Sequence, residues 1–256
     1  MNKIELPLLH MQIEILYEDE YLVVVNKPNN LLVHASYYAR NIKDPSLIAR
    51  LKTSIDTKLY PVHRLDYKTS GVIILAKSSV IASAIQKQFE TNSIKKRYFA
   101  LVRGYANETG VVDTPVKNPE TGVYKDAKTS YNSLLYTEVD IPVEPYPKSR
   151  YTWVELFPHT GRMHQLRKHM NKISHPIIGD HKYGNRHHNK MFADELGFEN
   201  MFLHAADIAF THPVSKTELK IVADLPEFWM DAFYAIDIPL LNFTAISNNN
   251  QNHSGE

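Results

Sequence analysis

Apolar residues occur along this chain mainly in short alternating or continuous runs, and both patterns are typical of strands. Such runs predict strands over 12–17, 21–25, 72–75, 96–102, 111–112, 130–136, 151–157, 201–210 and 219–223. In the strand over 96–102, alternation places Tyr98 on the face opposite Phe99. Apolar residues at helical spacing predict helices over 45–53, 80–90, 162–170 and 226–236.

The remaining segments carry little periodicity. Residues 142–147 are rich in proline and predict turns, and residues 181–200 indicate an insertion or a mobile loop. Strands and helices alternate too irregularly for a doubly wound parallel sheet. We therefore predict an α+β fold with a mixed, mostly antiparallel central sheet and flanking helices. It occupies a single domain over 1–240, and the polar residues 241–256 predict a disordered tail.

Composition favours a soluble protein. Of the 256 residues, 43% are hydrophobic, which is enough for a substantial core. No apolar run approaches the roughly 20 residues that cross a bilayer, and the first residues lack the layout of a signal peptide. The chain has no cysteine, which excludes disulfides and thiolate catalysis. We expect a monomer in the cytoplasm.

Positive charge is concentrated in one part of a balanced chain. There are 29 Lys or Arg against 28 Asp or Glu overall, but residues 159–190 hold seven Lys or Arg and one acid, Asp180. The same stretch holds seven of the 13 histidines. From charge alone, a solvated helix face and a footprint for a phosphate backbone are equally good interpretations.

The histidines at 159, 164 and 169 suggest a metal-dependent hydrolase or nuclease. Steps of five residues do not align ligands on one helix face as steps of four do. No carboxylate lies within the cluster either. We therefore predict no metal ligands.

Asp66 is the most informative polar residue of the chain. It lies among turn-forming residues directly before the apolar run 72–75, and this position presents a carboxylate on a loop held by a strand. An aspartate in a turn more often caps local backbone, so local physics favours the structural interpretation. Both interpretations stay open on these residues alone.

The element His63-Arg64-Leu65-Asp66, followed by Thr69-Ser70-Gly71, resembles the signature of the RluA-type pseudouridine synthases. Further segments resemble the same family in the same order: 25–28, 32–34, 96–104, 160–169, 175–180, 203–205 and 212–213. The resemblance spans roughly 12–230. It implies the α+β pseudouridine synthase fold, isomerisation of uridine in RNA, no cofactor, and catalysis by Asp66. The core starts by about residue 12, so we expect no preceding S4-type RNA-binding domain.

The resemblance also implies roles for residues elsewhere in the chain. Arg167 is expected to pair with Asp66, and guanidinium geometry suits a bidentate contact with a carboxylate. Tyr98 would stack on the target base, with its hydroxyl available for proton transfer, and Leu166 would contact the other face of the base. Arg64 would fill the space that the flipped base vacates. Other candidate RNA-binding residues are His63, Arg162, His164, Gln165, Lys168 and His169.

The expected partner is RNA. Within the family, the chain most resembles the members that modify uridine sixty-five of tRNA, as judged from segments such as 88–98 and 149–162. Ribosomal RNA enzymes of the family share the chemistry and the motifs, so a ribosomal target is the alternative. An RNA-binding module without catalysis is the alternative of another class.

Overall fold

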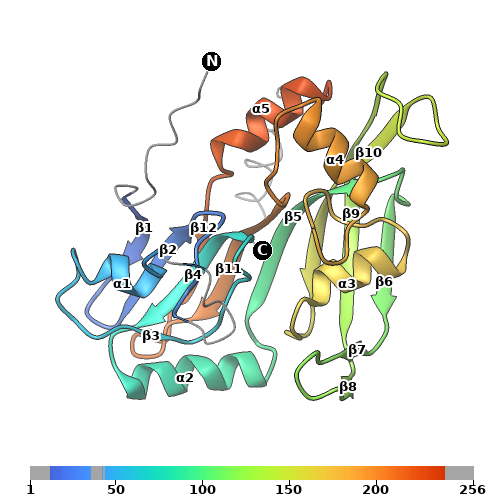
Figure 1. Ribbon diagram of the computed structural model, residues 1–256. Coiled ribbons are helices and arrows are strands. Elements are labelled where there is room, and N and C mark those ends of the chain that lie inside the picture. The colour runs from blue at the N-terminus through green and yellow to red at the C-terminus, as the bar shows by residue number, and fades with distance from the viewer. Residues whose placement is uncertain (1–11, 36–41, 43, 240–256) are drawn as a thin grey trace, which may run out of the picture.

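The computed structural model describes residues 12–35, 42 and 44–239. Its strands are β1 (Glu14–Glu18), β2 (Leu22–Lys27), β3 (Tyr60–Pro61), β4 (Ser70–Ala76), β5 (Lys95–Arg103), β6 (Thr109–Asp113), β7 (Val116–Lys117), β8 (Tyr124–Lys125), β9 (Lys128–Val139), β10 (Ser149–Pro158), β11 (Leu203–Thr211) and β12 (Glu218–Val222). Ten of them form one sheet, in the order β1-β2-β4-β11-β5-β10-β9-β6 with β3 beside β4 and β12 beside β11 (Figure 1). The β7 and β8 strands form a separate hairpin. The tail predicted for 241–256 lies outside the described residues.

The pairing of β4 with β11 is parallel, and every other strand pair of the described chain is antiparallel. The predicted mixed, mostly antiparallel sheet is therefore confirmed. Gly71 of β4 approaches β11 so closely that a Cβ would overlap the Ala205 carbonyl, and its φ of +109° also suits glycine alone. This contact fixes the start of β4 directly after the Asp66 loop.

Helices cover both faces of the sheet. They are α1 (Leu47–Leu51), α2 (Ser79–Glu90), α3 (Gln165–Lys172), α4 (Arg186–Asp194) and α5 (Glu227–Ala235). Within the described part of the chain, no helix is both long and apolar enough to cross a membrane. Because side chains alternate along a strand, Val23 of β2 packs with α1 while Val24 packs with α2 on the other face.

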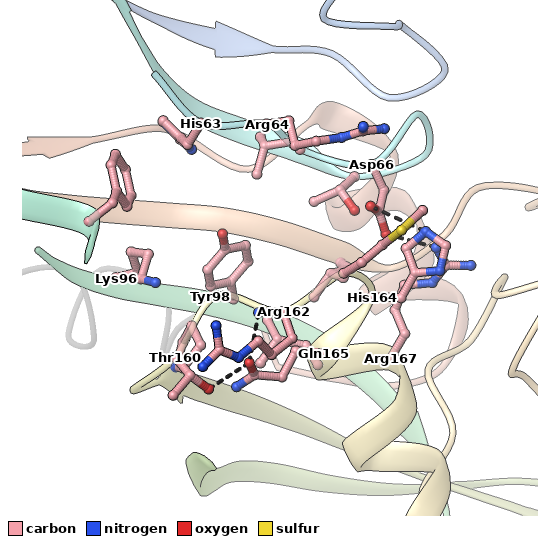
Figure 2. A pocket seen from close by; sticks show the side chains of 18 of the residues that line it. His63, Arg64, Asp66, Lys96, Tyr98, Thr160, Arg162, His164, Gln165 and Arg167 are labelled. Atoms are coloured by element: carbon pink, nitrogen blue, oxygen red, sulfur yellow. Dashed lines mark hydrogen bonds and ion pairs between the residues drawn. The ribbon is translucent and has the colours of Figure 1, made fainter. Parts of the chain in front are cut away.

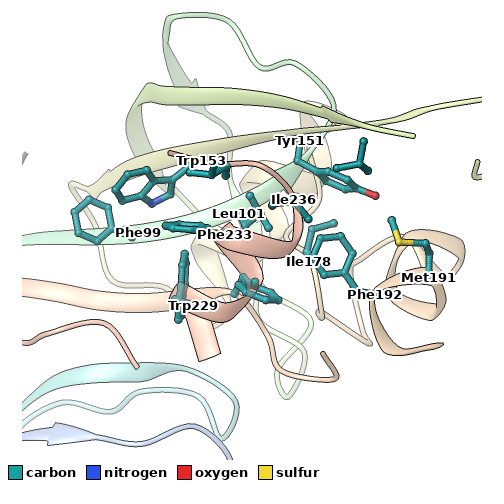
Figure 3. Close-up of a cluster of buried hydrophobic side chains, with 14 of the residues drawn as sticks. Phe99, Leu101, Tyr151, Trp153, Ile178, Met191, Phe192, Trp229, Phe233 and Ile236 are labelled. Carbon is teal, nitrogen blue, oxygen red and sulfur yellow. The ribbon is translucent and has the colours of Figure 1, made fainter. Parts of the chain in front are cut away.

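The second half of the sheet repeats this arrangement with other helices. Leu166 and Met170 of α3 pack with Ala100 and Val102 of β5. The opposite face of β5 and β10 supports an aromatic core that α4 and α5 cover (Figure 3). This core contains Phe99, Tyr151, Trp153, Phe192, Phe202, Trp229 and Phe233. Tyr98 and Phe99 therefore face different clusters, as the alternation predicts.

Two predicted segments are wrong in detail. The helix expected over 162–170 begins only at Gln165, because His164 adopts a left-handed backbone with φ of 57°. The segment 181–200, expected to be irregular, contains α4. Its buried face is formed by His188, Met191 and Phe192 at helical spacing. Because the first of these three residues is a histidine, the apolar periodicity is not evident in the sequence.

Three histidines are held neutral in the fold. His63 Nε2 accepts a hydrogen bond from the Ile74 backbone N–H, while His204 and His188 are buried and bonded to Ser70 and Tyr151. Burial is the main cause that lowers their pKa values, to about 3 for His63 and about 4 for the other two. Below pH 6.5 the unfolded chain therefore takes up protons that the folded protein refuses.

We predict that the free energy of unfolding falls as the pH is lowered from about 6.5 towards 4. Each such histidine contributes at most about 1.4 kcal/mol per pH unit. Thermal unfolding between pH 7.5 and 4.5 measures the slope, which His188→Gln should reduce. His181→Gln, an exposed change in the segment before the same helix, serves as the control. An unchanged slope in His188→Gln would contradict a neutral His188.

Candidate functional site

Asp66 lies in the loop between β3 and β4, and backbone contacts fix the shape of that loop. The Thr69 N–H donates to the Asp66 carbonyl at 3.0 Å, closing a turn. The Lys27 amine, fully buried at the end of β2, donates to the carbonyls of Pro28, Leu31 and Tyr67. Burial lowers the pKa of Lys27 to about 7, against the opposing charge of Asp66. The residue that follows Asp66 is thus tied to the loop after β2.

Arg167 on α3 holds the Asp66 carboxylate. Its Nη1 donates to Asp66 Oδ2 at 2.7 Å, across 101 positions of sequence. The two-point contact expected for this pair is made instead with Asp180, through Nε and Nη2, both at 2.7 Å. Asp180 is buried, and although burial alone would raise its pKa, Arg167 holds that pKa below its ordinary value. Asp180 therefore orients Arg167, which presents its remaining nitrogen to Asp66. Figure 2 shows Arg167 beside Asp66.

His164 approaches the other oxygen of the same carboxylate. Its Nε2 lies 3.5 Å from Asp66 Oδ1, and its Nδ1 lies 3.0 Å from the Tyr183 hydroxyl. The Tyr183 ring also lies 5.1 Å from the Arg167 guanidinium. Burial lowers the pKa of His164, and nearby cations act in the same direction against Asp66. A neutral imidazole therefore stands beside the carboxylate at neutral pH.

Tyr98 projects from β5 towards the same cavity. It packs against both the α1 cluster and the α3 cluster, at the place where the two halves of the sheet meet. Burial raises the pKa of its hydroxyl, and the charge of Asp66 raises it further. The phenol therefore stays protonated at neutral pH. Leu166 is buried beside it in the α3 cluster.

A cavity of about 590 Å³ joins these groups. Nine of the eleven predicted site residues line it: His63, Arg64, Asp66, Tyr98, Arg162, His164, Gln165, Leu166 and Arg167. Lys168 is not among the lining residues; its amine donates to the Lys117 carbonyl and lies 5.6 Å from the Tyr183 ring. His169, expected to contact RNA, is buried and bonded to Thr129 and Thr114. It is therefore a structural residue.

The remaining lining residues differ in how free they are to bind a ligand. The Gln165 side chain is buried and bonded to four groups of the protein, so it orders the turn before α3. His63 packs against Phe89 and accepts a hydrogen bond from the Ile74 N–H. Arg64 is exposed at the rim of the cavity. Arg162 donates from Nε to the Asp126 carbonyl.

The positive band predicted over 159–190 is divided by the fold. Arg167 turns inward to the two aspartates, and Lys190 pairs with Asp194 on α4. Within the described ranges, no group of three His, Asp or Glu side chains could hold a metal ion.

Three contributors to this site carried no role in the sequence interpretation. Asp180 stood out only as the single acid of a basic stretch, although its place in the segment 175–180 was a usable signal. Lys27 belongs to the segment 25–28, where a lysine at the end of an apolar strand marked a buried charge. No sequence pattern pointed to Tyr183, because its partners are Arg167 of α3 and His164, the residue that precedes α3.

Comparisons with known proteins agree with this geometry. Residues 21–172 match the family model described as RNA pseudouridylate synthase. The chain is similar to tRNA pseudouridine synthase C of Pasteurella multocida, with 39% identity over 237 residues that cover 89% of this chain and 97% of the relative. The enzyme of that name from Haemophilus influenzae is also 39% identical, covering 85% of this chain and 95% of the relative.

Solved structures show the same architecture. Human RNA Pseudouridylate Synthase Domain Containing 4 is 28% identical, with a TM-score of 0.64 over 86% of this chain and 92% of that one. Human RNA Pseudouridylate Synthase Domain Containing 1 has a TM-score of 0.66 at 23% identity, with 84% of each chain covered, which supports the fold. From the family model and from relatives that span nearly its whole length, the chain belongs to the RNA pseudouridylate synthase family.

Proposed function

We propose that this protein converts uridine sixty-five of tRNA to pseudouridine, with Asp66 as the catalytic carboxylate. The observation that carries the proposal is the ion pair between Asp66 and Arg167 in the wall of a cavity that Tyr98 also lines. A tRNA substrate is supported by the names of the relatives that cover most of the chain.

The reaction needs few groups. The bond between uracil N1 and the sugar breaks, a bond from C5 to the same sugar carbon forms, and the proton lost from C5 is balanced by one gained at N1. No atom or electron enters from outside, so a carboxylate, a proton carrier and a closed pocket are sufficient. Asp66 supplies the carboxylate, held in place by Arg167.

The cavity walls suit an extruded base. Leu166 belongs to the apolar cluster against which Tyr98 packs, and both line the cavity, so they can enclose a flat ring. A uridine within folded RNA must first be unstacked, at a cost of a few kcal/mol. Arg64 is exposed at the rim of the cavity, which supports the proposal that its side chain fills the gap left in the RNA.

The two contributions of Tyr98 can be separated by mutation. Stacking of a base on an aromatic ring is worth about 1–3 kcal/mol, so Tyr98→Ala should weaken RNA binding about 10- to 100-fold. Tyr98→Phe should keep that binding and lower turnover about 100-fold, because the proton carrier is lost. Binding and single-turnover assays measure the two effects, with exposed Tyr234→Ala as the control. Unchanged RNA binding by Tyr98→Ala would contradict the stacking role.

Mapping pseudouridine in cellular RNA tests the function directly. Cells that lack this protein should lose pseudouridine at one tRNA position, and the wild-type protein should restore it while Asp66→Asn should not. A change confined to ribosomal RNA would favour the ribosomal alternative. Unchanged maps in both RNA pools would overturn the proposal.

A further inference from the structure

Lys96 places an amine in the cavity without a protein anion beside it. Lys96 and Tyr98 are two residues apart on β5, so both side chains leave the same face of the strand (Figure 2). Among the described residues, its Nζ has no hydrogen bond or ion pair, and it lies 5.9 Å from the centre of the Phe89 ring. Glu90 and Glu120 line the cavity but form no ion pair with Lys96.

The other lining cations show how unusual this is. Arg167 is paired with two aspartates, Arg162 donates to a backbone carbonyl, and Arg64 is exposed to water at the rim. The Lys96 amine has no such partner and is largely withdrawn from water. This burial lowers its pKa below the ordinary value for lysine. A desolvated charge without a partner destabilises the ligand-free protein. An anion supplied by a ligand would offset this desolvation free energy.

There is also room for such an anion. Gly161 lies opposite the amine, and a Cβ at that position would stand 3.8 Å from Lys96 Nζ. Because glycine stands there, no side chain from this position enters the space beside the amine. The same space opens into the cavity that contains Asp66.

We propose that Lys96 binds a backbone phosphate of the RNA next to the target uridine, while Tyr98 contacts the base of that uridine. This inference rests on the proposed function, since RNA is the substrate that brings the phosphate. Two residues along a strand correspond to roughly 7 Å. At that spacing Lys96 can contact a phosphate while Tyr98 contacts the base. Lysine provides a mobile point charge on a long stem, which suits a phosphate approached from one side.

Salt dependence of binding gives the first test. Lys96→Gln should weaken binding of a tRNA transcript that carries uridine sixty-five about 10- to 100-fold. The slope of log K against log salt concentration should become shallower by about 0.7–0.9, the value for one phosphate contact. Lys95→Gln is the matched control, because Lys95 is exposed and lies on the opposite face of β5. Lys96→Arg should retain most of the binding.

A neutral backbone locates the contact. Methylphosphonate replacement of one phosphate flanking the target uridine should weaken wild-type binding as much as Lys96→Gln does, and combining the two changes should cost nothing more. An unchanged salt slope, or additive losses at every replaced phosphate, would overturn the inference, as would a loss confined to turnover, which would assign Lys96 to the base. If the wild-type protein forms no pseudouridine, the proposed function fails, while the binding slopes still decide the role of Lys96.

Discussion

Asp66→Asn should abolish pseudouridine formation while leaving the protein folded and able to bind RNA. The change keeps the size of the side chain but removes the charge that a nucleophile or a charge-stabilising group requires. Turnover should fall at least about 10³-fold, the range seen when a group that contacts the reacting atoms is removed. Because Arg167 keeps both hydrogen bonds to Asp180, we expect the cavity wall to retain its structure in this variant.

Single-turnover assays on a tRNA transcript measure the loss, and equilibrium binding to the same transcript measures what remains. The dissociation constant should change less than about threefold, or well under 1 kcal/mol. Asp231→Asn, an exposed change on α5, is the matched control and should behave as the wild-type protein. Turnover by Asp66→Asn above about a tenth of the wild-type rate would show that another group is the catalyst.

Much of the sheet could be predicted from its apolar pattern. The run 72–75 belongs to β4, all of whose residues are buried, and the alternation along β5 correctly separates Tyr98 from Phe99. Strands of two residues such as β3, β7 and β8 could not be predicted, because two positions carry no periodicity. The start of α3 was missed for a different reason, since the left-handed backbone of His164 leaves no trace in a hydrophobic pattern.

The site could be predicted only in part. Local physics made Asp66 a turn residue, and the family resemblance supplied its pairing with Arg167, whose Nη1 lies 2.7 Å from Asp66 Oδ2. The pairing of Arg167 with Asp180 was missed, because the geometry of a planar fork between two carboxylates depends on three separate segments. A basic stretch with one acid also looks like a solvated surface, although here that acid is buried at the centre of the network.

Arg167→Ala should damage both stability and catalysis, and a second substitution should separate the two. Removing the guanidinium leaves Asp180 buried without a partner, which should lower the free energy of unfolding by about 3–5 kcal/mol. It also frees the Asp66 carboxylate from its fixed position, and a displacement of about 1 Å is enough to lower turnover about 100-fold. Arg150→Ala, which breaks an exposed contact with Glu138, is the control and should change neither property appreciably.

The double variant Arg167→Ala/Asp180→Asn decides how Arg167 acts. Asp180→Asn removes the orphaned buried charge, so chemical denaturation should show that most of the lost stability returns. Turnover should remain low, because Asp66 still lacks the donor that fixes its carboxylate. If activity returned together with stability, Arg167 would serve folding alone. If stability returned without activity, Arg167 would have a role beyond folding. Its guanidinium, held by the buried Asp180, would fix the position of the Asp66 carboxylate.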